Sequence, residues 1–155
     1  MENVKKMIEA NFKEIYDLDY DNIYLIGGAL RECISKNTHE ITSKDLDFII
    51  LDKDDSKIKE LVNNNNLNYT INSFGGYKIK KENKTIDIWN NIDLYSAIQY
   101  NLDGLFYNVK YDLLIPVGYV DGINKKTLIE LNSSNVHPDP KRREDRLTSL
   151  KKLIE

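Results

Sequence analysis

Residues 23–32 read IYLIGGALRE and residues 43–48 read SKDLDF, and these two stretches decide how the chain folds. The apolar run Ile23–Ile26 ends at Gly27-Gly28, and the residues that follow are typical of a helix. This order predicts a buried strand, a tight glycine turn and a helix that begins right after the glycines. The stretch from Asp45 to Leu51 is apolar apart from its first and third residues, which predicts a second strand.

The second strand begins with two carboxylates on one face. Side chains alternate along a strand, so Asp45 and Asp47 point one way while Leu46 and Phe48 point the other. Carboxylates this close repel each other and are tolerated where solvent or a cation neutralises them. Mg²⁺ takes oxygen ligands and often bridges one or two carboxylates and substrate phosphates. Asp-X-Asp is a short and common pattern, so solvated aspartates at a strand edge remain the alternative.

A third aspartate, Asp87, lies in the alternating run Thr85–Trp89. Ile86 and Ile88 are expected to face the core, which leaves Asp87 on the opposite face of its strand. If this strand neighbours the one that carries Asp45, three carboxylates converge. Such a set suits a site with two metal ions about 3.5–4 Å apart, which clamp the attacking and leaving oxygens of a displacement.

The glycine turn is a candidate anion site. Backbone N–H groups at a helix N-terminus bind anions, and glycine lets a phosphate approach the backbone closely. Arg31 lies one turn into the expected helix and could reach a phosphate as a charged donor. The alternative is a plain tight turn with Arg31 on the surface. Neither a P-loop nor a Rossmann fingerprint is present, because the G-x-x-x-x-G-K pattern and the third glycine are missing.

The remaining pattern predicts an α/β (α+β) fold with a mixed central sheet flanked by helices. A hairpin is expected where two alternating runs flank the polar residues 82–84. Further helices and strands follow from apolar spacing. The expected helices lie near 3–16, 29–35, 54–62 and 94–106 and in a last segment with Leu147, Leu150 and Leu153, and the expected strands lie at 23–26, 45–51, 77–80, 85–89 and 111–117.

Length and composition favour one ordinary globular domain. The 155 residues fit a single domain, residues 1–155, and the net charge of −3 argues against a dedicated nucleic-acid binder, which needs a basic surface. The single cysteine, Cys33, fits a reducing compartment, and no apolar run is long enough to cross a bilayer. The first residues lack the apolar region of a signal peptide, so a cytoplasmic location without membrane attachment is expected.

In combination, the glycine turn, the Asp-X-Asp strand and the later lone aspartate resemble the nucleotidyltransferase superfamily of DNA polymerase β. Residues 23–32 and 43–48 look like the head domain of class II CCA-adding tRNA nucleotidyltransferases and bacterial poly(A) polymerases. The resemblance implies an enzyme that moves a nucleotide from an NTP to an acceptor hydroxyl with Mg²⁺, in a site that could hold two metals. It implies metal-binding catalytic residues Asp45, Asp47 and Asp87, and nucleotide-binding residues Gly27, Gly28, Arg31 and Lys44.

Three departures from the family concern the substrates. Glu32 stands where the family usually has Asp, and Ala97, Ile98 and Gln99 replace an Arg-Arg-Asp run that helps bind the nucleotide. No counterpart of the family's neck, body and tail domains, which grip tRNA, is expected within 155 residues. The segment Arg142–Leu147 resembles the closing helix of small nucleotidyltransferases that act on antibiotics or belong to toxin–antitoxin pairs.

Several partners therefore remain candidates besides the NTP. The acceptor is an RNA 3′ end or, alternatively, a small molecule or a protein, and a protein partner could supply acceptor binding. A catalytically silent NTP-binding module is the remaining alternative. The basic residues of the last helix would contact phosphate or form a solvated face, and they are Lys141, Arg142, Arg143 and Arg146.

Overall fold

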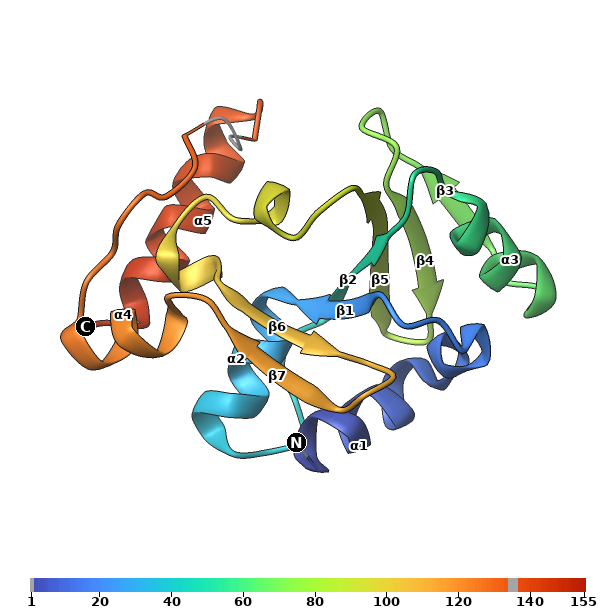
Figure 1. Ribbon diagram of the computed structural model, residues 1–155, viewed down its shortest axis with the longest axis horizontal. Coiled ribbons are helices and arrows are strands. Elements are labelled where there is room, and N and C mark those ends of the chain that lie inside the picture. Colours follow the sequence, from blue (N-terminus) through green and yellow to red (C-terminus); the bar gives the residue numbers. More distant parts are fainter. Residues whose placement is uncertain (1, 134–136) are drawn as a thin grey trace. The chain divides into compact units, whose positions relative to one another are not determined.

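The computed structural model describes residues 2–133 and 137–155. Its helices and strands alternate along the chain, with a cluster of strands in the middle (Figure 1). In order, the elements are α1 (Glu2–Phe12), the 3₁₀ helix η1 (Lys13–Leu18), β1 (Ile23–Ile26), α2 (Gly27–Lys36), β2 (Asp45–Leu51), α3 (Ser56–Asn64), β3 (Tyr69–Ile71), β4 (Tyr77–Lys81), β5 (Lys84–Asn91), the 3₁₀ helices η2 (Tyr95–Ala97) and η3 (Asn101–Asp103), β6 (Leu105–Asn108), β7 (Leu113–Pro116), α4 (Tyr119–Lys125) and α5 (Pro140–Lys152).

The strands form one seven-stranded mixed sheet in the order β3-β4-β5-β2-β1-β6-β7. β2 and β5 pair in parallel, whereas the pairs β1–β2, β1–β6, β3–β4 and β4–β5 are antiparallel. The expected mixed sheet flanked by helices is confirmed. The chain divides into two compact units, one from the described residues of 1–92 and 106–115 and the other from those of 93–105 and 116–155.

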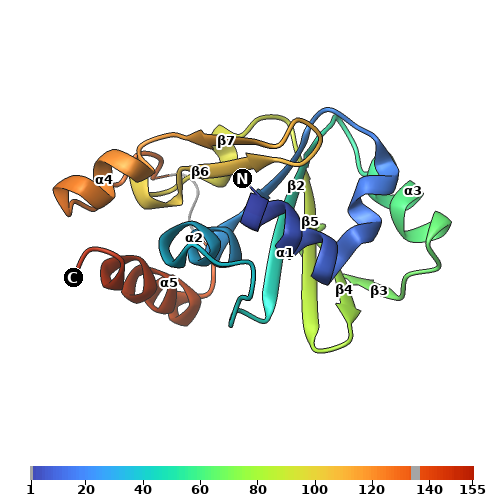
Figure 2. The same cartoon turned by 90° about the horizontal axis from the view of Figure 1, so that it is seen from below.

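The core of the first unit lies between the sheet and its N-terminal helices. Figure 2 shows α1 and α2 lying across the same face of the sheet. α1 buries Val4, Met7, Ile8 and Phe12, and the Phe12 ring lies 5.8 Å from the Phe48 ring of β2. Burying a side chain of this size stabilises the fold by roughly 1.5–3 kcal/mol. The helical spacing of these residues thus fixes which face of β2 is covered.

The hairpin of β4 and β5 sets the position of the β5 side chains. Glu82 adopts a left-handed conformation with φ 56°, and Lys81 pairs with Lys84 across the turn. The same register places Ile79 opposite Ile86, and both are fully buried. The hairpin predicted from the two alternating runs is therefore confirmed.

The helix expected near 94–106 was a wrong prediction. This stretch forms η2, η3 and then the strand β6, in which all four residues are buried. An apolar run covered on both sides fits a buried strand as well as a helix, so spacing alone misassigned it. β3 and α4 were not anticipated, because β3 has only three residues, all exposed, and α4 contains Gly122. α2 also begins at Gly27 itself, two residues earlier than expected.

A buried carboxylate organises the second unit. Asp103 accepts hydrogen bonds from the backbone N–H groups of Gln99 (3.2 Å) and Tyr100 (2.9 Å), and Arg146 of α5 lies 2.8 Å from the same oxygen. The side chain of Asp103 is only 7% exposed. Asp139 caps the start of α5 by accepting from the backbone N–H of Lys141. Of the basic residues of α5, Arg146 thus has a structural ion pair.

No helix among the described residues is both long enough and apolar enough to cross a bilayer.

Replacing Asp103 with Ala is expected to lower the free energy of unfolding by about 3 kcal/mol, because two backbone N–H groups and Arg146 lose a buried acceptor. Urea denaturation measures this loss. The matched control is Asp145→Ala, which removes an exposed ion pair with Lys141 and should cost less than about 0.5 kcal/mol. Equal losses in the two variants would contradict the structural role assigned to Asp103.

Candidate active site

Three aspartates lie on the face of the sheet opposite α1 and α2. Leu46 and Phe48 are fully buried on the helix side, so the intervening Asp47, which is half-buried, and the exposed Asp45 point the other way. In the parallel pair, Asp47 of β2 lies directly opposite Asp87 of β5. Paired residues of neighbouring strands point to the same side of a sheet, so Asp87 shares this face.

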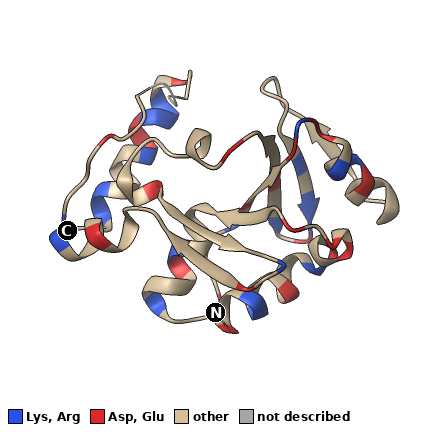
Figure 3. Ribbon diagram, viewed as in Figure 1, with Lys and Arg blue, Asp and Glu red and all other residues tan. Residues whose placement is uncertain are grey.

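A lysine that the sequence analysis did not single out lies beside these aspartates. Lys78 of β4 pairs with Asp87 in the register of the hairpin, and its Nζ lies 3.9 Å from Asp87 Oδ1. The side chain of Asp87 is 14% exposed and that of Lys78 is 40% exposed. Figure 3 shows the basic residues along β4. Counting back from the turn at Glu82 would have placed Lys78 opposite Asp87 from the sequence alone.

Gly27 is required where β1 turns into α2. Its φ of 83° favours glycine, and a Cβ at this position would lie 2.6 Å from Asp47 Oδ2. Gly28 differs, because a Cβ there would meet no atom within 4 Å. The helix cap, Ile26, makes no side-chain hydrogen bond to the first turn. The start of α2 therefore lies against the Asp47 carboxylate, and the position of a Gly28 side chain is open space.

The other expected phosphate ligands lie close by in sequence. Arg31 is half-buried in α2, one turn after Gly27, and Lys44 is exposed directly before Asp45 at the start of β2. The structure thus brings the glycine turn and the aspartates Asp47 and Asp87 together. Whether Arg31 and Lys44 contact a nucleotide stays a prediction.

Glu32 has a structural role that the sequence did not reveal. Its carboxylate accepts from the backbone N–H (2.8 Å) and the hydroxyl (2.8 Å) of Thr42, from the backbone N–H of Ser43 (3.0 Å) and from Lys36 (3.4 Å). Burial alone would raise the pKa of Glu32, but these hydrogen bonds outweigh it and lower the pKa to about 2. Glu32 is therefore an ionised anchor for the segment before β2.

Two other residues behave as simple packing groups. Burial raises the pKa of the Cys33 thiol to about 11, with the Glu32 charge as a lesser cause, so the thiol is protonated at neutral pH. Trp89 shares the face of Asp87, and its indole packs against the backbone of Gly76, where a Cβ would lie 2.3 Å from Nε1.

The donor set on the aspartate face suits Mg²⁺ in chemistry, because all three groups offer carboxylate oxygens. Among residues 2–133 and 137–155, no group of three His, Cys, Asp or Glu side chains is arranged to hold a metal ion. Mg²⁺ commonly binds through one or two carboxylates and completes its shell with phosphate oxygens and water. Asp45 and Asp47, with the cradle at Gly27, fit that mode.

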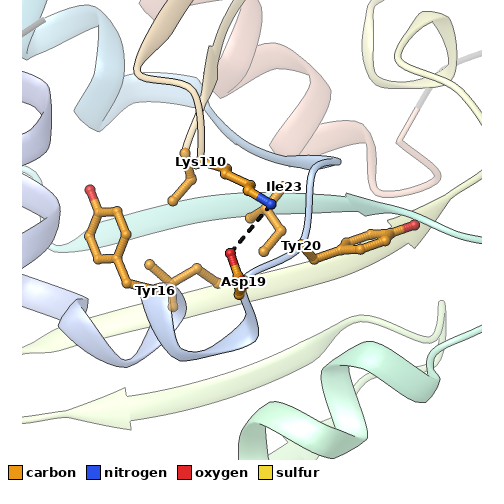
Figure 4. A pocket seen from close by; sticks show the side chains of 7 residues that line it. Tyr16, Asp19, Tyr20, Ile23 and Lys110 are labelled. Carbon is orange, nitrogen blue, oxygen red and sulfur yellow. Dashed lines mark ion pairs between the residues drawn. The ribbon is translucent and has the colours of Figure 1, made fainter.

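A separate cavity lies on the helix side of the sheet. It measures about 180 Å³, and Ile23, which pairs with Ile50, lines it together with Tyr16 and Tyr20 (Figure 4). Lys110, also in its lining, pairs with Asp19 at 3.4 Å. This cavity is therefore on the face opposite the aspartates.

Replacing Gly27 with Ala is expected to lower the free energy of unfolding by at least about 1 kcal/mol, because the left-handed conformation and the Asp47 carboxylate both oppose a side chain. Gly28→Ala is the matched control and should leave stability unchanged or slightly raised. Denaturant titration compares the two, and equal effects would contradict the cradle geometry.

Glu32 is expected to make stability depend on pH. Its pKa of about 2 in the folded protein lies below its ordinary 4.5, so its contribution is complete above about pH 5 and declines as pH falls toward 2. Relative to Glu32→Gln, the native protein should be more stable by roughly 2 kcal/mol at pH 7, allowing for solvent screening near the surface. Urea titrations from pH 7 to pH 3 should show this difference shrinking, and a constant difference would contradict the assignment.

Comparison with known proteins gives matches in structure only. No protein-family model matches the sequence, and no curated protein matches it. A solved tRNA-processing enzyme in its apo form I is similar over 99% of this chain and 46% of its own, with a TM-score of 0.64 and 18% identity. A CCA-adding enzyme in complex with ATP is similar over 98% of this chain and 41% of its own, with a TM-score of 0.59 and 14% identity.

A tRNA nucleotidyltransferase with a primer tRNA and an incoming ATP analogue is similar over 97% of this chain and 48% of its own, with a TM-score of 0.58 and 20% identity. The chain thus spans less than half the length of these three proteins. At such identities the likeness concerns the fold. The chain has a nucleotidyltransferase-like fold that resembles the head domain of CCA-adding enzymes.

Proposed function

We propose that this protein is a Mg²⁺-dependent nucleotidyltransferase that moves an NMP from an NTP to an acceptor hydroxyl and releases pyrophosphate. One observation carries the proposal. The parallel register of β2 and β5 sets Asp47 opposite Asp87, at the point where Gly27 brings the start of α2 against Asp47. Carboxylates beside the backbone N–H groups of a helix start provide complementary partners for a metal and for the phosphates that it accompanies.

Each group has one task in this proposal. Asp45 and Asp47 hold Mg²⁺, which supplies neutralisation of phosphate charge when it is bound. The backbone N–H groups at Gly27 and Gly28 donate to the triphosphate, and Arg31 and Lys44 add charged donors. These residues hold the α-phosphorus in place for the acceptor, so catalysis is mostly positioning and electrostatic stabilisation.

The chemical step forms one bond and breaks one. The acceptor oxygen attacks the α-phosphorus, and the bond to the bridging oxygen on the opposite side breaks, so that pyrophosphate leaves with the electron pair. Asp87 accepts the proton of the acceptor hydroxyl. Lys78 places a positive charge 3.9 Å from Asp87 Oδ1.

Two classes of acceptor are candidates for the proposed transfer. An RNA 3′ end is favoured by the fold, because one similar structure holds a primer tRNA beside an ATP analogue. A small molecule or a protein side chain is favoured by the net charge of −3 and by the pairing of Arg146 with Asp103. Incubation with α-labelled NTPs and either total RNA or protein lysate tests the acceptor. Label in the RNA or in the protein identifies that class, and label in neither points to a small molecule or to an inactive protein.

A catalytically silent NTP-binding module is the second candidate function. The segment that replaces the Arg-Arg-Asp run favours it, because Gln99 donates its side-chain N–H to Glu130 (3.0 Å) and is only 7% exposed. Calorimetry with ATP and Mg²⁺ beside a turnover assay discriminates between the two. Binding without any turnover supports the silent module.

Asp45→Asn and Asp47→Asn are each expected to lower pyrophosphate release from an NTP by at least about 100-fold, because each removes a charged metal ligand. Thermal unfolding should show that both variants still fold. The matched control is Asp17→Asn, which removes an exposed carboxylate of η1 and should keep full activity. Full activity in either of the first two variants would rule out the proposed mechanism.

A further inference from the structure

The segment between α2 and β2 is tied to α2 through one carboxylate. Residues 38–44 form no helix or strand, and they lead directly into Asp45. Glu32 Oε2 accepts from both the backbone N–H and the hydroxyl of Thr42, and Glu32 Oε1 accepts from the backbone N–H of Ser43. The Glu32 side chain is 10% exposed, although Thr42 itself is exposed, so the carboxylate is the buried partner in these bonds.

The contacts continue from Ser43 to the two strands that carry the aspartates. The Ser43 hydroxyl donates to the backbone carbonyl of Asp45 at 3.1 Å. The carbonyl of Ser43 accepts from Lys84 Nζ at 2.6 Å, and the carbonyl of Lys44 accepts from the backbone N–H of Thr85 at 2.8 Å. The segment that Glu32 holds therefore joins the beginning of β2 to the beginning of β5, two residues before Asp87.

On its other side, Glu32 belongs to α2, the helix that begins at the glycine turn. Glu32 follows Arg31 directly and lies five residues after Gly27 in α2. α2 is firmly seated, because Ala29, Leu30 and Cys33 are buried. A helix of this kind is rigid over two turns, so a side chain fixed on it keeps a constant distance from the helix start.

We propose that Glu32 is a positioning residue that sets the Asp45–Asp47 strand against the phosphate-binding start of α2. It acts through Thr42 and Ser43 and touches no substrate. This inference rests on the proposed function and deepens it, because it names the group that holds the metal-binding and phosphate-binding halves of the site in register. Catalytic groups need placement within about 0.5 Å, which an unanchored segment of seven residues would not provide.

The chemistry of the anchor requires both carboxylate oxygens. Glutamine keeps the shape of the side chain but has one acceptor oxygen, so either the Thr42 or the Ser43 N–H loses its partner. Aspartate keeps both oxygens but is shorter by one methylene, so it reaches the segment only if the segment moves toward α2. The two variants therefore damage the anchor in different ways.

The test uses the full chain and the variants Glu32→Gln and Glu32→Asp, with Lys36→Gln as the matched control. Lys36 contacts the same carboxylate at 3.4 Å but lies outside the anchored segment, and its side chain is 61% exposed. Three quantities are measured well below the unfolding temperature. They are the hydrogen-exchange rates of the Thr42 and Ser43 amides, the affinity for ATP with Mg²⁺, and kcat and KM for pyrophosphate release.

Glu32→Gln is expected to speed exchange of the Thr42 or Ser43 amide at least tenfold and to lower kcat at least tenfold, with a smaller change in KM. Glu32→Asp should recover part of kcat, and Lys36→Gln should match the native protein in all three quantities. A role in stability alone would lower the unfolding temperature of Glu32→Gln and leave kcat unchanged. Native amide exchange or native kcat in Glu32→Gln would overturn the inference.

Failure of the proposed function has a different signature. If the native protein releases no pyrophosphate with any NTP and acceptor fraction, the proposed transfer is wrong whatever Glu32 does. The positioning role is then decided by amide exchange and by ATP–Mg²⁺ affinity. Faster exchange with at least tenfold weaker binding in Glu32→Gln supports it, and native values in both overturn it.

Discussion

The parallel pairing of β2 with β5 is the constraint on which the candidate site depends. Parallel neighbours need a long crossover, and here α3, β3 and β4 lie between the two strands in sequence. Slipping the register by one residue would turn Asp87 toward α1 and α2. The buried residues Leu46 and Phe48 of β2, with Ile86 and Ile88 of β5, prevent this slip, because it would expose them. Burial of the apolar side chains on the helix side of the sheet therefore sets the register that places Asp47 opposite Asp87 on the other side.

On the face away from α1 and α2, solvent and neighbouring groups offset the negative charge of the three aspartates. Asp45 is exposed to solvent, Asp87 has Lys78 at 3.9 Å, and Asp47 lies against the start of α2. The positive end of a helix dipole favours a carboxylate at that place. The left-handed Gly27 is the backbone feature that permits this close approach. In the proposed function, the same carboxylates would attract a cation, and the positive start of α2 would attract the phosphates.

The second unit is held by buried polar groups. Asp103 receives two backbone N–H groups and Arg146, and Asn101 donates to the carbonyl of Thr127 and accepts from the N–H of Ile129. Such networks specify one arrangement of the unit. A buried polar group that loses its hydrogen-bond partner costs more free energy than an exposed group would, because water cannot replace the partner. The fold is shared with enzymes more than twice as long, so the acceptor has to be argued from the site.

Alternation along the chain by itself determined that Asp45 and Asp47 share a face, that Asp87 lies in the second strand of a hairpin and that a strand ends at the glycine turn. These are local consequences of covalent geometry, which any strand or turn obeys. Spacing misassigned residues 94–106, because the buried strand β6 at the end of this stretch has no period of its own. It missed β3, because three exposed residues are too few to show an alternation. That Asp87 lies opposite Asp47, and that Glu32 reaches Thr42 and Ser43, was decided only in three dimensions. The pairing of distant segments depends on how the whole apolar surface is buried, which no single stretch of sequence contains.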